Sequence, residues 1–256
     1  MYETKMYWRM EPMQGENKTL LYLYDDISEY GKWNWNTWSY DQSETSAKYF
    51  AEKLAEIPDG QQIELHLNSN GGSVKEGVAI YNLLKQKANQ KTGIVDGVAH
   101  SVAFLILQAC DKRIMCLGTT ALVHNMWMGC YGNASQLRKY ADDLDSMMES
   151  NRQVFLERAA IDEETLIELM EKETYLTPDK ALEYGLIDEI MGKQAKQQKE
   201  NDLTQKLSQM QQMLNSQQSF REQIALMRSN QRRPGNVKMM NIFKGLTAQK
   251  GGKDEK

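Results

Sequence analysis

The sequence lacks any run of apolar residues long enough to span a lipid bilayer, which takes about 18–20 residues. The longest candidate, residues 98–110, is interrupted by a histidine, a serine and a glutamine. The first ten residues also lack the apolar stretch of a secretory signal peptide. We therefore expect a cytoplasmic protein that is neither exported nor held in a membrane.

Cysteine and histidine are both scarce, with three of each in 256 residues. The cysteines are odd in number and match no zinc-binding spacing, so we expect a reduced compartment. The histidines are dispersed and no carboxylate cluster accompanies them at ligand spacing, so we predict neither a metal nor another cofactor. If the protein is a histidine-dependent enzyme, its base is His66, His100 or His124.

Positive charge is scarce over most of the chain. The net charge is −4, which argues against a uniformly basic nucleic-acid binder. Residues 193–256, however, carry a net charge of +8, and the preceding residues carry the balance of −12. We predict two parts: a globular domain over residues 1–192, and a basic, Gln- and Lys-rich tail over residues 193–256 that is helical or partly disordered.

Segments typical of strands and helices alternate along the first part. Strands are predicted over residues 20–27, 63–69, 93–98, 113–116 and 121–124. Helices are predicted over residues 45–57, 73–87, 101–109, 135–159, 163–171 and 178–184. This alternation predicts an α/β domain with a mostly parallel sheet.

Residues 31–40 are unusual because they contain three tryptophans, at positions 33, 35 and 38. One interpretation is a strand or lid that packs on the core. The other is a surface for docking a peptide or another subunit.

Three short motifs could carry chemistry, and each has a plainer interpretation. The Gly71-Gly72 turn between a strand and a helix is either structural or an oxyanion-binding turn. Ser101 starts an apolar helix, where serine serves either as an N-cap or as a nucleophile. His124 ends a short strand and is either a structural polar residue or a general base.

The remaining candidates are less sharply defined. His66 alternates with leucines in a strand, which favours a structural role, and His100 is a poor base for its neighbour because consecutive helical residues point in different directions. A catalytic triad also needs a carboxylate. The sequence alone leaves four choices open: Asp162, Glu171, Glu173 and Asp179.

Four segments together resemble the ClpP family of serine peptidases over residues 17–192. They read IELHLNSNGGSVKEGVAIYNLL, GVAHSVAFLILQACDKRIM, ALVHNMWMG and ETYLTPDKALEYGLIDEI. Their order and spacing agree with the family: a serine about 30 residues after the Gly-Gly turn, a histidine 23 residues later and an acid 49 residues after that. The resemblance implies a ClpP/crotonase-like fold of repeated β-β-α units with a mostly parallel sheet, followed here by a C-terminal helical extension.

The resemblance also implies roles for individual residues. Ser101 matches the nucleophile, His124 the general base and Glu173 the acid. The amides of Gly72 and Val102 match the oxyanion hole.

The chain departs from housekeeping family members in three places: Glu173 stands for aspartate, Asn70 for proline, and His100 for a small residue. The Glu-Thr pair, the aromatic N-terminal region and the segment GNASQLRKYADDLD resemble the phage and prophage branch. That branch implies a serine endopeptidase, ATP-independent or ATPase-assisted, that processes capsid or scaffold proteins during head maturation in the bacterial cytoplasm or inside proheads.

The resemblance implies a homo-oligomer, because members of the family assemble into rings. It does not decide whether the protein also works with an ATPase partner. The basic tail suggests a capsid or scaffold partner, with nucleic acid disfavoured. Two other functions remain open: a catalytically inactive ClpP-like scaffolding or shell protein, and a crotonase-fold enzyme acting on acyl-CoA thioesters.

Overall fold

The computed structural model describes residues 8–13, 17–193, 206–208, 210–212 and 222–226. The helical interpretation of the tail falls mostly outside these residues. In the part of the chain that is described, no helix is long and apolar enough to cross a membrane.

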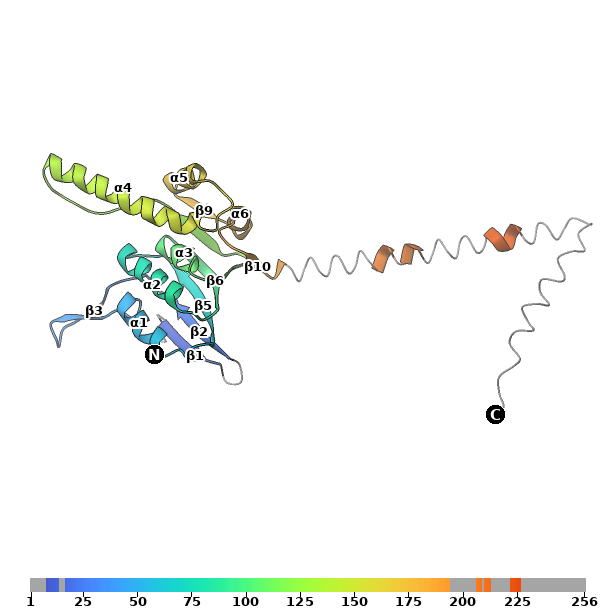
Figure 1. Cartoon of the computed structure of the whole chain (residues 1–256), viewed down its shortest axis with the longest axis horizontal. Coiled ribbons are helices and arrows are strands. Elements are labelled where there is room, and N and C mark those ends of the chain that lie inside the picture. Colours follow the sequence, from blue (N-terminus) through green and yellow to red (C-terminus); the bar gives the residue numbers. More distant parts are fainter. Residues whose placement is uncertain (1–7, 14–16, 194–205, 209, 213–221, 227–256) are drawn as a thin grey trace, which may run out of the picture. The chain divides into compact units, whose positions relative to one another are not determined.

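An eight-stranded, mostly parallel sheet forms the centre of the domain (Figure 1). Its main path runs β1-β2-β5-β6-β7-β10, and β8 and β9 pair beside the end of β6. The pairs β1–β2 and β8–β9 are antiparallel, and the other pairs in this sheet are parallel. The prediction of an α/β domain with a mostly parallel sheet is confirmed. The strands are β1 (Trp8–Pro12), β2 (Lys18–Leu23), β5 (Gln62–Ser69), β6 (Lys91–His100), β7 (Lys112–Cys116), β8 (Thr120–Val123), β9 (Thr174–Leu176) and β10 (Glu189–Met191).

Within residues 17–193, six helices accompany this sheet. They are α1 (Ala47–Ala55), α2 (Val74–Gln86), α3 (Val102–Leu107), α4 (Ala134–Leu156), α5 (Glu163–Glu171) and α6 (Pro178–Glu183). Several begin at the side-chain caps that helix starts prefer: the hydroxyl of Ser73 accepts the Glu76 amide, and Asn133 forms a capping box with Gln136. These local signals explain why the predicted helices agree with the observed ones to within a few residues.

Alternation along the central strands separates a buried face from a more polar one. In β5, Ile63, Leu65 and Leu67 are buried, while Glu64 and His66 between them are only half-buried. The buried residues join α2 and α3 in one apolar core. Helix α4 reaches this core through Phe155, whose ring lies 5.8 Å from that of Phe104.

Strand β6 divides its pairing between two partners, and this division shapes the site. Its first half pairs with β7, from Thr92 to Val95, and its second half pairs with β8, from Val98 to His100. The residues that follow β6 and β8 are therefore neighbours, because parallel strands end at the same edge of a sheet.

The tryptophan-rich segment forms a separate hairpin of β3 (Tyr30–Asn34) and β4 (Ser39–Gln42). Figure 1 shows it reaching away from the sheet and its helices. Trp35 and Trp38 are 72% and 73% exposed. The interpretation of this segment as a strand or lid packed on the core is therefore wrong, and the aromatic rings contact one another instead.

Candidate active site

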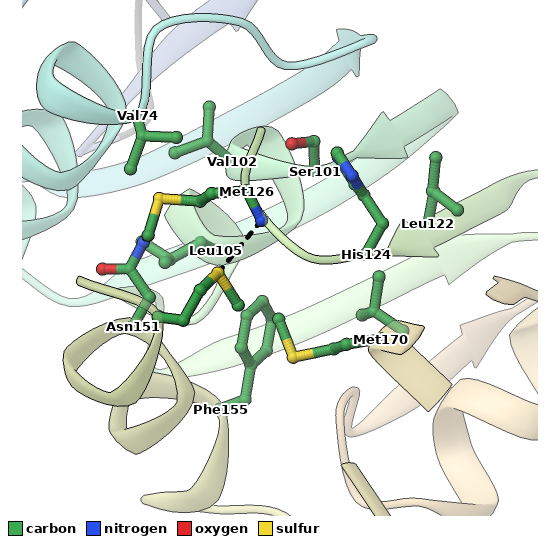
Figure 2. Close-up of a pocket in the computed structure, with 12 residues that line it drawn as sticks. Val74, Ser101, Val102, Leu105, Leu122, His124, Met126, Asn151, Phe155 and Met170 are labelled. Atoms are coloured by element: carbon green, nitrogen blue, oxygen red, sulfur yellow. Dashed lines mark hydrogen bonds between the residues drawn. The ribbon is translucent and has the colours of Figure 1, made fainter. Parts of the chain in front are cut away.

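Ser101 and His124 lie together at the carboxyl edge of the sheet. Ser101 follows β6 directly and His124 follows β8, and the Ser101 amide donates to the carbonyl of Leu122 at 2.9 Å. Both side chains line the same cleft, and Figure 2 draws them beside each other at one end of an apolar pocket. The parallel pairing of β6 with β8 thus joins two residues that are 23 positions apart in the sequence.

The backbone of Ser101 is strained. Its φ is 56° and its ψ is −129°, a conformation that non-glycine residues adopt at a cost of order 1–3 kcal/mol. Its side chain makes no capping bond to α3, so the N-cap interpretation of this serine is wrong. Among the described residues, nothing hydrogen-bonds its hydroxyl, and the strain serves to present that group at the sheet edge.

The Gly71-Gly72 turn lies directly against this serine. An added Cβ on Gly71, where φ is +93°, would lie 2.8 Å from the Ser101 Cβ and 2.6 Å from the His100 carbonyl oxygen. On Gly72, where φ is +138°, it would lie 2.3 Å from the Ile27 carbonyl oxygen. Only glycine permits both the positive φ and the close approach at these two positions.

Two backbone amides next to Ser101 have no partner within the described part of the chain. They belong to Gly72, in the turn, and to Val102, at the first position of α3. The turn itself is fixed: the Ile27 amide donates to Gly71 and the Ser73 amide donates to Ile27, at 2.7 and 2.8 Å. Rigid, unpaired amides near a nucleophile can stabilise an oxyanion.

Two adjoining hollows meet at Ser101 and His124. One is an open cleft of about 330 Å³, whose described lining residues are Asp26, Asn70, Gly71, Gly72, Val74, Ser101, His124, Met126 and Trp127. The other is narrow and mostly apolar, with α3, β8, α4 and α5 supplying its walls (Figure 2). Its lower wall is fixed by the Met126 amide, which donates to the Met148 sulfur at 3.0 Å.

Glu173 is brought opposite His124 by strand register. Strands β8 and β9 pair Val123 with Thr174 in antiparallel register, so the next residues along the two chains are His124 and Glu173. Within the described residues, neither side chain makes a hydrogen bond, and Glu173 is exposed with a φ of 49°. The strand register thus places residue 173 opposite residue 124, while Glu173 is not among the described residues that line the cleft or the apolar pocket.

Two other carboxylates that the sequence left open have structural partners. Asp162 caps α5 by accepting the Thr165 amide at 2.9 Å, and hydrogen bonds from Thr165 lower its pKa. Asp179 forms an ion pair with Lys193. Glu171 lies in the last turn of α5. Of the four candidates, Glu173 alone has a register position opposite His124.

His100 stays outside the cleft. It ends strand β6 rather than lying on a helix, so the predicted helix start at Ser101 is one residue early and the reason given for excluding His100 was wrong. Its Nε2 lies 3.0 Å from the Thr120 hydroxyl, and its ring lies edge-on to Tyr175. Burial lowers the pKa of His100, and electrostatic repulsion from His124 lowers it further.

His66 is held in a polar network on the half-buried face of the sheet. Its Nδ1 lies 2.7 Å from Asp96 and its Nε2 lies 3.2 Å from Glu64. Burial disfavours the charged ring, but hydrogen bonds and charge from Asp96 and Glu64 outweigh this effect and raise the pKa of His66.

In the described part of the chain, no group of three or more His, Cys, Asp or Glu side chains is arranged to hold a metal ion.

Sequence reasoning missed several lining residues. Asp26 and Trp127 border the open cleft, and Met148 and Asn151 border the apolar pocket. Trp127 lies inside the segment ALVHNMWMG, but neither it nor the other three was singled out as a site residue. Asp26 was missed because the strand was predicted to run to residue 27, whereas β2 ends at Leu23 and the following segment turns toward the Gly-Gly turn.

The sheet topology and this cleft together define the chain as an α/β protein of ClpP-like fold. The comparison with known proteins agrees: the family model for Clp protease matches residues 42–194. The chain belongs to the Clp protease family and is therefore a ClpP-type protease.

Two relatives illustrate the similarity. The chain is 32% identical over 156 residues to ATP-dependent Clp protease proteolytic subunit 1 of Prochlorococcus marinus (strain MIT 9312), which covers 59% of this chain and 80% of that protein. It is 28% identical over 133 residues to the ATP-dependent Clp protease proteolytic subunit of Deinococcus radiodurans, which covers 51% of this chain and 65% of that protein. The family match begins at the end of the aromatic hairpin, so most of that hairpin lies outside it.

Proposed function

We propose that this protein is a serine endopeptidase in which Ser101 is the nucleophile and His124 the general base. The observation that carries the proposal is the strained Ser101, which presents an unpaired hydroxyl beside His124 and against the Gly71-Gly72 turn. Strain of this kind persists where the surrounding structure enforces it, and it gathers at functional sites.

The reaction is acyl transfer from a peptide to the enzyme and then to water. The Ser101 oxygen attacks the scissile carbonyl while His124 takes the hydroxyl proton. The same proton passes to the departing amine when the C–N bond breaks. His124 then takes a proton from a water molecule that attacks the acyl-enzyme, and it returns this proton to the Ser101 oxygen as the acyl–oxygen bond breaks and the second product leaves.

Stabilisation of the oxyanion is assigned to the amides of Gly72 and Val102. Both lie next to Ser101 and neither has a partner in the described residues. Removing one such donor typically lowers the rate by about 10²–10³-fold. Glycine at position 72 is needed because a side chain there would meet the Ile27 carbonyl.

Glu173 is the proposed acid of the triad. Its register position opposite His124 supports the assignment, and two of the other three candidates, Asp162 and Asp179, are engaged as a helix cap and in an ion pair. Glutamate is one methylene longer than the aspartate of housekeeping members. Catalytic hydrogen bonds are often long before substrate binds, so we expect the contact between Glu173 and His124 to form in the complex.

The substrate is proposed to be an extended polypeptide with an apolar side chain next to the scissile bond. The narrow pocket beside Ser101 has walls of Val74, Val102, Leu105 and Phe155, which favour an apolar group. The Gly71-Gly72 segment offers the backbone edge along which an extended chain can add a strand.

Capsid or scaffold protein of a phage is the substrate that we propose, and assembly of several copies into a ring is the proposed oligomeric form. The Glu-Thr pair at positions 173 and 174, the aromatic region and the +8 charge of residues 193–256 support this proposal. Each relative's name describes an ATP-dependent proteolytic subunit, so we extend the proposal to include an ATPase as an optional partner rather than a required one.

The first test is intact-mass analysis after treatment with a fluorophosphonate. We expect one adduct at Ser101, lost in Ser101→Ala and strongly slowed in His124→Ala. The matched control is His66→Gln, which removes an imidazole outside the cleft and should label like the wild type. Absence of an adduct from the purified protein and from the protein co-expressed with capsid protein would favour an inactive shell protein instead.

The acid is tested separately by peptide hydrolysis. Loss of a triad carboxylate can lower kcat by about 10⁴-fold, so we expect a large loss in Glu173→Gln and partial recovery in Glu173→Asp. Asp179→Asn is the control because its carboxylate pairs with Lys193. Equal activity of Glu173→Gln and the control would remove Glu173 from the triad.

The substrate is tested by co-expression with a phage scaffold or capsid protein. We expect Ser101-dependent cleavage of that protein, and reduced incorporation into proheads when residues 193–256 are deleted. Normal incorporation of the truncated chain would reject the proposed role of the tail and leave the peptidase assignment standing.

A further inference from the structure

Asp26 lines the open cleft together with Gly71, Gly72, Ser101 and His124. The proposed acyl-transfer reaction makes no use of this carboxylate. It lies on the segment that leaves β2 and approaches the Gly-Gly turn, so it borders the path of any peptide that reaches Ser101.

The position of Asp26 is fixed by its backbone. Its amide donates to the carboxylate of Asp25 at 2.8 Å, and its carbonyl accepts the Thr45 hydroxyl at 2.8 Å. The next residue, Ile27, is bonded on both sides to the Gly71–Ser73 segment. The main chain at Asp26 is therefore held in one place relative to the oxyanion turn.

The negative charge of Asp26 is not compensated within the described part of the chain. Its carboxylate accepts a hydrogen bond from the Asn70 side-chain amide at 3.4 Å, and no lysine or arginine is among the described residues that line the cleft. Asp26 is also the only acidic side chain among the described residues that line it. An exposed carboxylate without a cationic partner at the edge of a substrate cleft attracts a cationic side chain, and this attraction grows when the bound peptide excludes water.

We propose that Asp26 makes the enzyme select substrates that carry lysine or arginine beside the scissile bond. This inference rests on the proposed function. The cleft and the apolar pocket meet at Ser101 and His124, so a peptide that crosses the nucleophile places one flanking residue in each. The preferred site is thus an apolar residue on one side of the bond and a basic residue on the other.

The expected size of the preference is about 10-fold in kcat/KM for lysine over glutamine, which corresponds to ~1.4 kcal/mol. The preference is smaller if the ion pair stays exposed to water and larger if the bound peptide shields the ion pair from water. Because the interaction is electrostatic, the preference should shrink as salt is added.

The experiment compares three peptides that share an apolar residue at the cleavage position and differ only beside it, with lysine, glutamine or glutamate. Each is cleaved by the wild type, Asp26→Asn and Asp26→Lys. Asp59→Asn removes an equal charge from a fully exposed turn outside the cleft and is the matched control. Fluorophosphonate labelling of Ser101 is measured in parallel for every variant.

We expect the wild type and the Asp59→Asn control to prefer lysine, Asp26→Asn to lose the preference, and Asp26→Lys to prefer glutamate. A wild type that labels at Ser101 and cleaves all three peptides equally would overturn the inference and leave the proposed function intact. A preference that survives in Asp26→Asn would overturn it as well. Absence of both labelling and cleavage would instead reject the proposed function, and the inference with it.

Discussion

Substitution of Gly71 by alanine tests the close approach between the Gly-Gly turn and the nucleophile. The new Cβ would lie 2.6 Å from the His100 carbonyl oxygen and 2.8 Å from the Ser101 Cβ. Ordinary contacts of a Cβ begin at 3.4 Å, so the turn and the start of α3 must separate by roughly 0.6–0.8 Å to relieve these contacts.

Two costs add in this variant. A side chain at positive φ costs about 1–2 kcal/mol, and overpacking of a tightly packed site costs about 1–3 kcal/mol more. We therefore expect the free energy of unfolding to fall by about 2–5 kcal/mol. Misplacement of reacting groups by about 1 Å lowers rates by about 10²-fold, so peptidase activity should fall by that factor or more.

Gly60→Ala separates the two costs. Gly60 has a similar φ of +80°, but nothing lies within 4 Å of an added Cβ there. Urea unfolding should show only the cost of positive φ in this control, about 1–2 kcal/mol, with labelling of Ser101 unchanged. Both variants are measured by urea unfolding and by the rate of fluorophosphonate labelling.

The reasoning is refuted if Gly71→Ala loses no more stability than Gly60→Ala and labels at the wild-type rate. That result would mean that the turn does not press against the serine. A loss of labelling without loss of stability would instead show that the turn moves easily and that its role is confined to the reaction.

Two further predictions concern charged groups in the sheet. Arg113 is fully buried and donates to Asp188, to Gln108 and to the Gly185 carbonyl. Arg113→Met should therefore lower the free energy of unfolding by about 3 kcal/mol, the low end for a broken buried ion pair. Urea titration measures this change, and an unchanged unfolding midpoint would contradict the prediction. The pKa of His66 is raised in the folded protein, so its interaction stabilises the fold below its ordinary pKa and is lost as pH rises through the raised value. His66→Gln should therefore lower stability more at about pH 5.5 than at about pH 8.5, and an equal loss at both would refute this.

Much of the fold could be predicted because local signals agreed with the tertiary structure. Helix α5 has the predicted bounds, since Asp162 caps its start and Leu166 and Met170 face the core. Strand β5 was equally clear from its alternation of buried and half-buried residues. Such elements depend on near neighbours in the sequence, which a single chain displays directly.

The aromatic hairpin shows where local reasoning fails. Three tryptophans favoured a strand or lid packed on the core over an exposed docking surface, because hydrophobicity alone does not say which face is covered. The structure places Trp35 and Trp38 on an exposed hairpin. The rings contact one another there, and this pairing depends on a turn whose geometry the composition does not reveal.

The candidate site divides in the same way. Residue types and spacing were enough to single out Ser101, His124 and the Gly71-Gly72 turn. They could not distinguish a serine that caps a helix from one whose hydroxyl points into the cleft. That difference depends on the φ of 56° that Ser101 adopts where β6 ends beside β8. Nor could they choose among four carboxylates, since only the β8–β9 register places Glu173 opposite His124.

The sequence by itself determined the α/β class, most element boundaries and the glycine turn, because each rests on local periodicity and conformational preference. Only the tertiary structure decided that β6 divides its pairing and brings residues 23 positions apart to one edge, and that Asp26 borders the same cleft. The physical reason is that strand pairing and side-chain packing join distant parts of the chain, and no local preference encodes which parts meet.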